Sequence, residues 1–362
     1  MSDLLPHRPV LYQEIIHALQ PQRGGEYVDG TLGAGGHAWG ILQASSPGGR
    51  LLGLDVDPQA IALARERLAS FGDRAIIVQA SYLSLPEQLE ALGWQSVQGI
   101  LLDLGVSSMQ LDTPERGFSF QSDAPLDMRF DPQQPLRAAD LVNQLPEREL
   151  ADVIFRFGEE RRAFQIARAI VASRPVLTTG QLAEIVARVL AGGKGSYKPG
   201  GIHPATRTFQ ALRIATNQEL VSLEQFLPLA VKALAPGGRL AVISFHSLED
   251  RLVKQFFRRE SQDCLCPPRQ PVCTCGHRAA VKEVSILGIS RQPIRPQLEE
   301  VAVNPRARSA RLRVVEKLPA PAGKIEEKLE VRQAGTTLAN HGAGSPALQE
   351  KFHFITISGT KL

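Results

Sequence analysis

Short apolar runs alternate with helix-like stretches through the first hundred residues, and no other feature of the sequence constrains the fold as strongly. The apolar runs are EYVD (26–29), LLGLD (51–55), AIIVQ (75–79) and GILLD (99–103). The clearest amphipathic stretch between them begins with Asp57 as its N-cap and Pro58 at the first helical position. This order predicts an α/β fold with a parallel, doubly wound sheet.

The alternation stops after Gly105. Residues 112–146 are rich in Pro, Asp and Arg with weak periodicity, which predicts a loop. Helical stretches are expected next, at 147–157, 161–173, 179–191 and 204–217. A turn and a buried strand are then expected over 234–246, so the sheet resumes after an insertion.

We therefore expect a discontinuous core over 1–111 and 213–316. A mainly helical substrate domain, 112–212, interrupts it. The segment 317–362 turns to Ala, Gly, Lys and Glu, and we expect a poorly ordered tail there.

The chain has 362 residues with 43% hydrophobic content, and no apolar run reaches the roughly 18 residues of a membrane span. Its first residues carry Asp3 and lack the basic and apolar regions of a secretory signal. We expect a cytoplasmic protein with no membrane partner.

Positive charge is concentrated near the C-terminal end. The stretch from Arg251 to Lys317 holds 14 Lys and Arg against 6 Asp and Glu, a net of +8, whereas the whole chain carries +4. The remainder is therefore about −4 by difference. This asymmetry favours a polyanion such as nucleic acid as partner. An ordinary solvated face is the alternative.

All four cysteines lie in DCLCPPRQPVCTCGH, at Cys264, Cys266, Cys273 and Cys275. Disulfides are not expected without a secretory signal. Paired thiols are typical of zinc sites, but C-x-C pairs place two ligands on one ion less readily than C-x-x-C pairs. A structural metal and a reduced surface loop both stay open, and we assign no metal.

A glycine-rich loop, DGTLGAGGH (29–37), follows the first apolar run. It lacks the Lys of a phosphate-binding P-loop. The dinucleotide spacing survives through Gly33, Gly35 and Ala38. However, Asp29 directly before the glycines would repel a pyrophosphate and suits a cationic amine. Asp55, at the end of the second run, can accept hydrogen bonds from a ribose diol.

These two acids favour S-adenosylmethionine as cofactor, because it has an ammonium, a sulfonium and no phosphate. A plainer role for Asp55 is a strand-end carboxylate that caps a turn. Asp57 is assigned to the N-cap.

With DGTLGAGGH, LLGLDVDPQAI and GILLDLGVSSMQLD in order, the chain resembles class I S-adenosylmethionine-dependent methyltransferases. Further motifs resemble the MraW/RsmH family, namely ERGFSF, PLDMR, GEER, HPATRTFQALRI, APGGRL, SFHSLEDR and NPRARSARLR. The resemblance runs from about His7 to Glu316. It implies a Rossmann-like core with an inserted helical domain. It also implies methylation of N4 of a cytosine in 16S ribosomal RNA of the small subunit, near the decoding site.

The cofactor residues that the resemblance implies are Gly35, Gly36, His37, Asp55, Tyr82, Asp103 and Gln110. The first three would contact the methionine end, Asp55 the ribose and Tyr82 the adenine. Asp103 would lie beside the methyl group, with Gln110 following it. Tyr82 could equally be a core aromatic, and Gln110 alone would be an unremarkable loop amide.

Asp103 is also our candidate catalytic residue, as acceptor for the hydrogens of the cytosine amine. Cofactor binding alone is the alternative. We expect direct displacement without an enzyme nucleophile. No aromatic residue follows Asp103 to stack a base, so Phe118, Phe120 and Phe209 are candidates, with core packing as their alternative.

Two further groups are candidate substrate residues. His203, Arg207 and Gln210 have the spacing of one helix face, and His246 follows the resumed strand with Glu249 and Asp250. Both groups could line an RNA channel or form a buried polar network. The basic stretch 304–313 contributes Arg306 and Arg308 as phosphate contacts, with Arg311 and Arg313 beyond them. The solvent face of an edge strand is the alternative.

Two rival functions remain from the sequence. One is a nicotinamide-dependent oxidoreductase, which the glycine spacing permits. The other is an RNA-binding ribosome assembly factor without catalysis. The sequence does not distinguish naked RNA from an assembled subunit as substrate, and it leaves the oligomeric state open.

Overall fold

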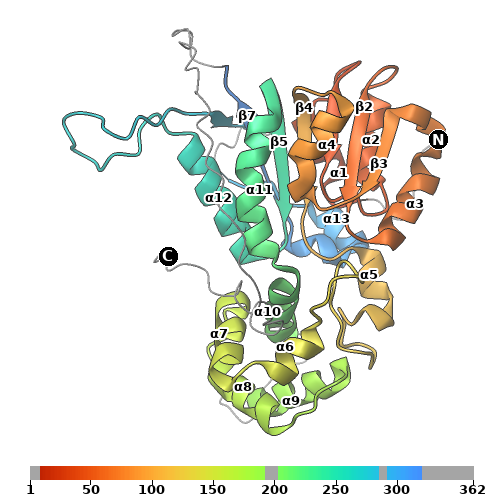
Figure 1. The fold of residues 1–362 in the computed structure, drawn as a ribbon, viewed down its shortest axis with the longest axis vertical. Helices are drawn as coiled ribbons and strands as arrows, with labels where there is room; N and C mark the ends of the chain where they lie inside the picture. Colours follow the sequence, from red (N-terminus) through yellow and green to blue (C-terminus); the bar gives the residue numbers. More distant parts are fainter. Residues whose placement is uncertain (1–8, 192–202, 285–291, 320–362) are drawn as a thin grey trace, which may run out of the picture. The chain divides into compact units, whose positions relative to one another are not determined.

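A computed structural model describes residues 9–191, 203–284 and 292–319. It contains a seven-stranded sheet in the order β3-β2-β1-β4-β5-β7-β6 (Figure 1). The strands are β1 (Glu26–Asp29), β2 (Arg50–Asp55), β3 (Ala75–Gln79), β4 (Val97–Asp103), β5 (Leu234–Ser244), β6 (Val281–Glu283) and β7 (Arg311–Lys317). Strands β1 to β5 are parallel, and β7 runs antiparallel to β5 and β6. The predicted doubly wound α/β sheet is confirmed.

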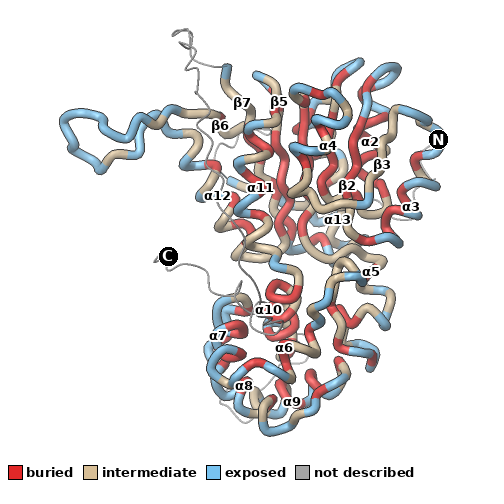
Figure 2. The backbone as a smooth tube through the Cα atoms, in the orientation of Figure 1, coloured by how far each residue is buried: buried red, intermediate tan, exposed pale blue. Residues whose placement is uncertain are grey.

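Helices cover both faces of the sheet. One face carries α1 (Tyr12–Leu19), α2 (Gly36–Ala44) and α3 (Pro58–Leu68), and the other carries α4 (Leu85–Leu92), α11 (Glu219–Ala233) and α12 (Ser247–Glu260). Successive strand residues alternate between the two cores, so Tyr27 packs on the first face and Val28 on the second. The strands are accordingly buried along most of their length (Figure 2).

Between β4 and β5 the chain leaves the sheet. It forms α5 (Ser108–Asp112), α6 (Ala138–Gln144), α7 (Glu147–Gly158), α8 (Ala163–Ala172), α9 (Thr179–Ala191) and α10 (Thr206–Asn217). The last four agree with the predicted helices. The loop predicted over 112–146 is wrong at α6, a helix of seven residues whose buried positions are Ala138, Leu141 and Val142. Three apolar positions give too short a helical periodicity to be recognised among the surrounding Pro and Asp residues.

Short elements complete the described chain, namely η1 (Ala69–Arg74), η2 (Tyr82–Ser84), η3 (Pro114–Arg116), α13 (Leu298–Val303) and η4 (Pro305–Ser309). One compact unit extends to Pro319. The predicted tail lies outside the described residues from 320 onward. In the described part of the chain, no helix has the length and apolar character needed to cross a membrane.

Candidate active site

Glycines shape the loop that follows β1. Gly35 occupies the N-cap of α2 with a φ of 76°, a region that side chains rarely adopt. A Cβ on Gly35 would lie 3.2 Å from Leu68, and one on Gly36 would collide with the Pro9 ring. Both positions therefore require glycine for local packing, whatever they bind.

Asp29, His37 and Asp103 meet at the carboxyl ends of β1 and β4. The Nε2 atom of His37 lies 3.7 Å from Oδ2 of Asp103, and the Asp103 amide donates to the Thr31 hydroxyl at 2.6 Å. Both ring nitrogens of His37 and Oδ1 of Asp103 are buried without a hydrogen-bond partner. Such atoms are uncommon in native proteins, so their convergence indicates a site shaped for a polar ligand.

Burial raises the pKa of Asp29 to about 7. His37 and the Thr31 amide lower this pKa, and the Asp103 carboxylate raises it. The carboxyl group is only 1% exposed. Because it is poised between its neutral and charged forms near pH 7, a nearby cation would stabilise the carboxylate.

Asp55 holds the backbone of the glycine loop. Its Oδ2 accepts from the Gly33 amide at 2.8 Å and its Oδ1 from the Asp57 amide at 2.9 Å. Burial raises the pKa of this carboxyl group. Each carboxylate oxygen has a second lone pair that can accept another hydrogen bond. The turn-capping contacts are therefore compatible with a contact to ribose, which stays a prediction.

Tyr82 begins η2, and its ring meets Phe226 edge to face at 4.9 Å between centroids. Burial raises the pKa of its hydroxyl group. The ring thus packs against the core at the end of β3. The contact between the other face of the Tyr82 ring and adenine stays a prediction.

Asp57 connects α3 with α5 and η3, a role that the sequence did not reveal. The carboxylate is fully buried. Its Oδ1 caps α3 by accepting from the Gln59 amide at 3.0 Å, as predicted. Its Oδ2 accepts from Gln110 at 2.9 Å and from the Arg116 guanidinium at 2.6 Å. Gln110, 5% exposed, also accepts from the Ser107 amide, so most of its amide group is used within the protein.

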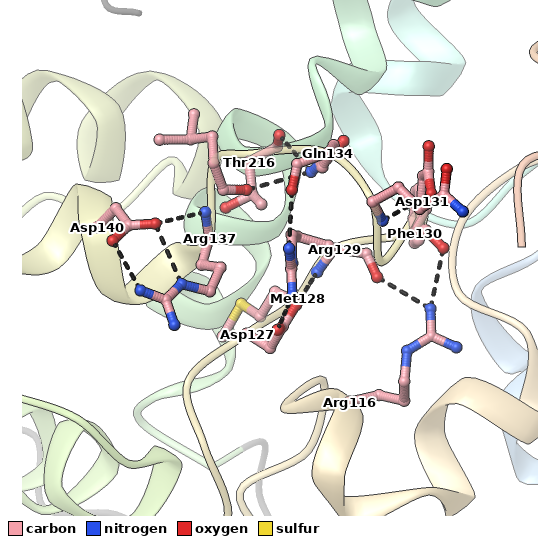
Figure 3. A network of polar contacts seen from close by, with 12 residues as sticks. Arg116, Asp127, Met128, Arg129, Phe130, Asp131, Gln134, Arg137, Asp140 and Thr216 are labelled. Atoms are coloured by element: carbon pink, nitrogen blue, oxygen red, sulfur yellow. Dashed lines mark hydrogen bonds and ion pairs between the residues drawn. The ribbon is translucent and has the colours of Figure 1, made fainter. Parts of the chain in front are cut away.

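The network continues from Arg116 into the segment 127–137 (Figure 3). Arg116 donates to the carbonyls of Arg129 and Phe130 at 3.0 and 2.9 Å. Arg129 pairs with Asp127 at 2.7 Å, and the Phe130 amide donates to Asn217 at 2.7 Å. These contacts tie the end of β2 to the C-terminal end of α10.

The candidate base-stacking residues differ in exposure. Phe118 is 8% exposed and stacks on Phe130, and Phe209 is 5% exposed. Phe120 is half-buried, with its ring 4.5 Å from that of His203. Of the three, Phe120 has the most free surface.

His203 lies before α10, so the prediction that it shares a helix face with Arg207 and Gln210 is wrong. Its Nδ1 accepts from the Ala205 amide at 3.2 Å, which caps the turn leading into the helix. Gln210 donates to the Phe157 carbonyl and braces α10 against α7. Arg207 is 58% exposed, 3.7 Å from Glu160.

His246 belongs to a buried polar network. It caps α12, and its Nε2 lies 3.1 Å from Glu249. Burial acts to raise the pKa of Glu249, but His246 and Arg213 outweigh burial, so this pKa lies below its usual value. Arg213 also pairs with both oxygens of Glu219 at 2.8 Å. Ligand atoms of Glu219, His246 and Glu249 lie within 4.8 Å of one another, and both carboxylates are paired within the protein, Glu219 with Arg213 and Glu249 with His246.

The basic stretch divides into two kinds of arginine. Arg311 and Arg313 lie on β7 and pair with Asp250 at 2.9 and 2.7 Å. The edge-strand alternative is wrong, because β7 lies between β5 and β6. Arg306 pairs with Asp112 at 2.5 Å, and Arg308 is exposed on η4.

Comparison with solved structures finds chains of low identity. A putative rRNA-methylase from Clostridium thermocellum is 12% identical, covering 87% of this chain and 100% of that one, with a TM-score of 0.38. A putative methyltransferase from Streptococcus mutans, solved in complex with SAH, is 9% identical with a TM-score of 0.39, covering 86% and 99%.

Curated relatives are much more similar. A ribosomal RNA small subunit methyltransferase H from Dehalococcoides mccartyi is 50% identical, covering 93% of this chain and 95% of its own. One of the same name from Symbiobacterium thermophilum is 51% identical, covering 87% and 97%. The model of the MraW methylase family matches residues 4–318. The chain therefore belongs to the MraW methylase family.

Proposed function

We propose that this protein transfers a methyl group to N4 of a cytosine in 16S ribosomal RNA, near the decoding site. Family membership supports methyl transfer, and the relatives' names support ribosomal RNA of the small subunit. The cytosine and its position rest on the resemblance of the sequence motifs. The observation that carries the proposal is the buried Oδ1 of Asp103, which lacks a hydrogen-bond partner at the end of β4.

S-adenosylmethionine is the cofactor, and when bound it supplies the methyl group. The residues fit it, because Asp29 favours a cation and His37 offers two unpartnered ring nitrogens. Gly35, Gly36 and His37 would hold the methionine end. Asp55 would hold the ribose, Tyr82 the adenine, and Gln110 would support the loop near the methyl group.

Asp103 acts on the acceptor amine. Its free oxygen accepts a hydrogen bond from the amine, which orients the amine and raises the electron density on nitrogen, and it accepts the proton that nitrogen loses on methylation. The carboxylate also offsets the positive charge that develops on nitrogen. The Asp103 amide, which donates to the Thr31 hydroxyl at 2.6 Å, holds the residue at the end of β4, so positioning accounts for much of the rate in this proposal.

The RNA partner is the small ribosomal subunit in the cytoplasm. The inserted segment 112–212 forms the substrate domain in this proposal. We assign His203, Arg207 and His246 to contacts with the substrate, and Arg306 and Arg308 to phosphate contacts, for which Arg306 would have to leave its ion pair with Asp112.

The test uses small subunits from cells that lack this gene. Purified protein and cofactor should restore N4-methylcytosine at one position, detected by mass spectrometry of the RNA. Asp103→Asn should lower kcat by about 10²-fold or more while S-adenosylhomocysteine affinity falls less than tenfold. The proposed reaction would be refuted if the RNA stayed unmethylated after treatment with protein that binds S-adenosylhomocysteine.

The same measurements separate the rivals. Calorimetric binding of NAD in place of S-adenosylhomocysteine would support an oxidoreductase. RNA binding with no methyl transfer, unaltered by Asp103→Asn, would support an assembly factor. We expect tight S-adenosylhomocysteine binding and no NAD binding.

A further inference from the structure

The loop between α12 and β6 gathers all four cysteines of the chain. Their Sγ atoms lie within 4.8 Å of one another. The closest pairs are Cys264–Cys273 at 3.5 Å, Cys264–Cys275 and Cys273–Cys275 at 3.7 Å, and Cys266–Cys273 at 4.0 Å. Four sulfurs therefore sit at the corners of a compact polyhedron.

These distances match a zinc tetrahedron. A Zn–S bond of about 2.3 Å places the sulfurs of a tetrahedral site about 3.8 Å apart. A disulfide needs about 2.05 Å, much less than any pair here. A C-x-C pair can approach closely enough to hold one ion here, because the sulfurs of Cys273 and Cys275 lie 3.7 Å apart, and those of Cys264 and Cys266 lie within 4.8 Å of each other.

Backbone amides are aimed at the sulfurs. The Leu265 amide donates to Cys275 at 3.3 Å, the Cys266 amide to Cys264 at 3.4 Å, and the Thr274 amide to Cys266 at 3.3 Å. These N–H···S contacts help to fix the positions of three of the four sulfurs.

The loop has little else to hold its shape. Residues 261–280 contain no helix or strand and are exposed over most of their length (Figure 2). Val272 near the tip is 70% exposed. Ordered loops of this length without secondary structure are uncommon, and segments too small for an apolar core are commonly stabilised by a metal.

We propose that Cys264, Cys266, Cys273 and Cys275 form a structural zinc site that keeps this loop folded. Four thiolates fill the tetrahedron and leave no open position, as in structural rather than catalytic sites. Binding forms four Zn–S bonds and releases up to four protons from the thiols, with no change of oxidation state. His277 is not a ligand, because its Nε2 contacts the Arg259 carbonyl at 3.0 Å.

Metal analysis of the full chain tests the site. Protein purified under reducing conditions without chelator should hold close to one zinc per chain, and Cys264→Ser/Cys273→Ser should lose at least nine-tenths of it. Replacement by cobalt(II) should give the visible spectrum of tetrahedral tetrathiolate coordination. His277→Ala is the matched control and should keep both the metal and the spectrum.

Trypsin provides a readout that is independent of activity. Arg269 lies within the loop, so removing zinc should speed cleavage after it at least tenfold, and added zinc should restore protection. Three outcomes would overturn the proposal: less than a tenth of a zinc per chain even after zinc is added, disulfides among these cysteines in the freshly isolated protein, or loss of metal in His277→Ala. S-adenosylhomocysteine binding by the double serine variant shows that its core is folded.

Discussion

A single carboxyl group, that of Asp29, couples folding to pH. Its pKa is about 7 in the folded protein against 3.8 when exposed. Between these values the folded state holds a proton that the unfolded state has released. The contribution of Asp29 to stability is therefore fully present below about pH 4 and is lost as the pH rises through about 7.

Asp29→Asn should remove this dependence. We expect the free energy of unfolding of the wild type, relative to the variant, to fall by up to about 4 kcal/mol between pH 4 and pH 8. Urea unfolding across that range measures the difference. Asp73→Asn, at an exposed carboxyl group, is the control for the loss of a carboxyl group as such. Parallel profiles for wild type and Asp29→Asn would contradict the assigned pKa.

At the scale of elements, periodicity predicted most of the fold. The four early strands and the helices α7 to α10 are long enough for their apolar spacing to identify them. The helix α6 was missed because it is short. The helix α3 ends at Leu68, and a 3₁₀ turn follows it that contains Gly72 at a φ of 56°.

The site was predictable only in part. Motif resemblance identified the loops at the strand ends, where Asp103 and His37 meet. It did not reveal the second role of Asp57, because its partners Gln110 and Arg116 are 53 and 59 residues away in the sequence. Nor did alternating arginines reveal that Asp250 neutralises two of them. Such pairings depend on tertiary packing, which local patterns do not encode.

The Asp57 network predicts strong coupling between β2–α3 and the segment after α5. Asp57→Asn keeps an N-cap acceptor but leaves Arg116, 14% exposed, without its carboxylate. We expect a loss of about 3–5 kcal/mol in chemical denaturation. Arg116→Met is the partner variant. The double variant should lose less than the sum of the two, by about 0.5–3 kcal/mol. Additive losses would show that the ion pair does not couple the two segments.

On the scale of the whole molecule, the basic C-terminal third is less available to RNA than its charge count indicates. Arg311 and Arg313 are committed to Asp250, and Arg306 to Asp112. Exposed arginines such as Arg308 are therefore better placed to contact phosphates.

Arg308→Ala should weaken binding to the small subunit and reduce the slope of log K against log salt by about one, without lowering the Tm. Arg313→Ala is the contrast. It should lower the Tm because Asp250, 10% exposed, loses a close partner. Fluorescence titration at several salt concentrations and thermal unfolding measure the two effects. An unchanged salt slope for Arg308→Ala would exclude its phosphate contact.

The long segment between β4 and β5 determines the order in which parts of the chain can fold during translation. β4 ends at Asp103 and β5 begins at Leu234. At about 5–20 residues per second, translation of the intervening chain takes roughly 7–26 s. During that interval β4 can pair with β1 on one side, but the backbone groups on its other side, which later pair with β5, have no partner strand. The helices between β4 and β5 therefore have time to form before β5 can pair with β4, and we expect the nascent chain to need chaperones most during this interval.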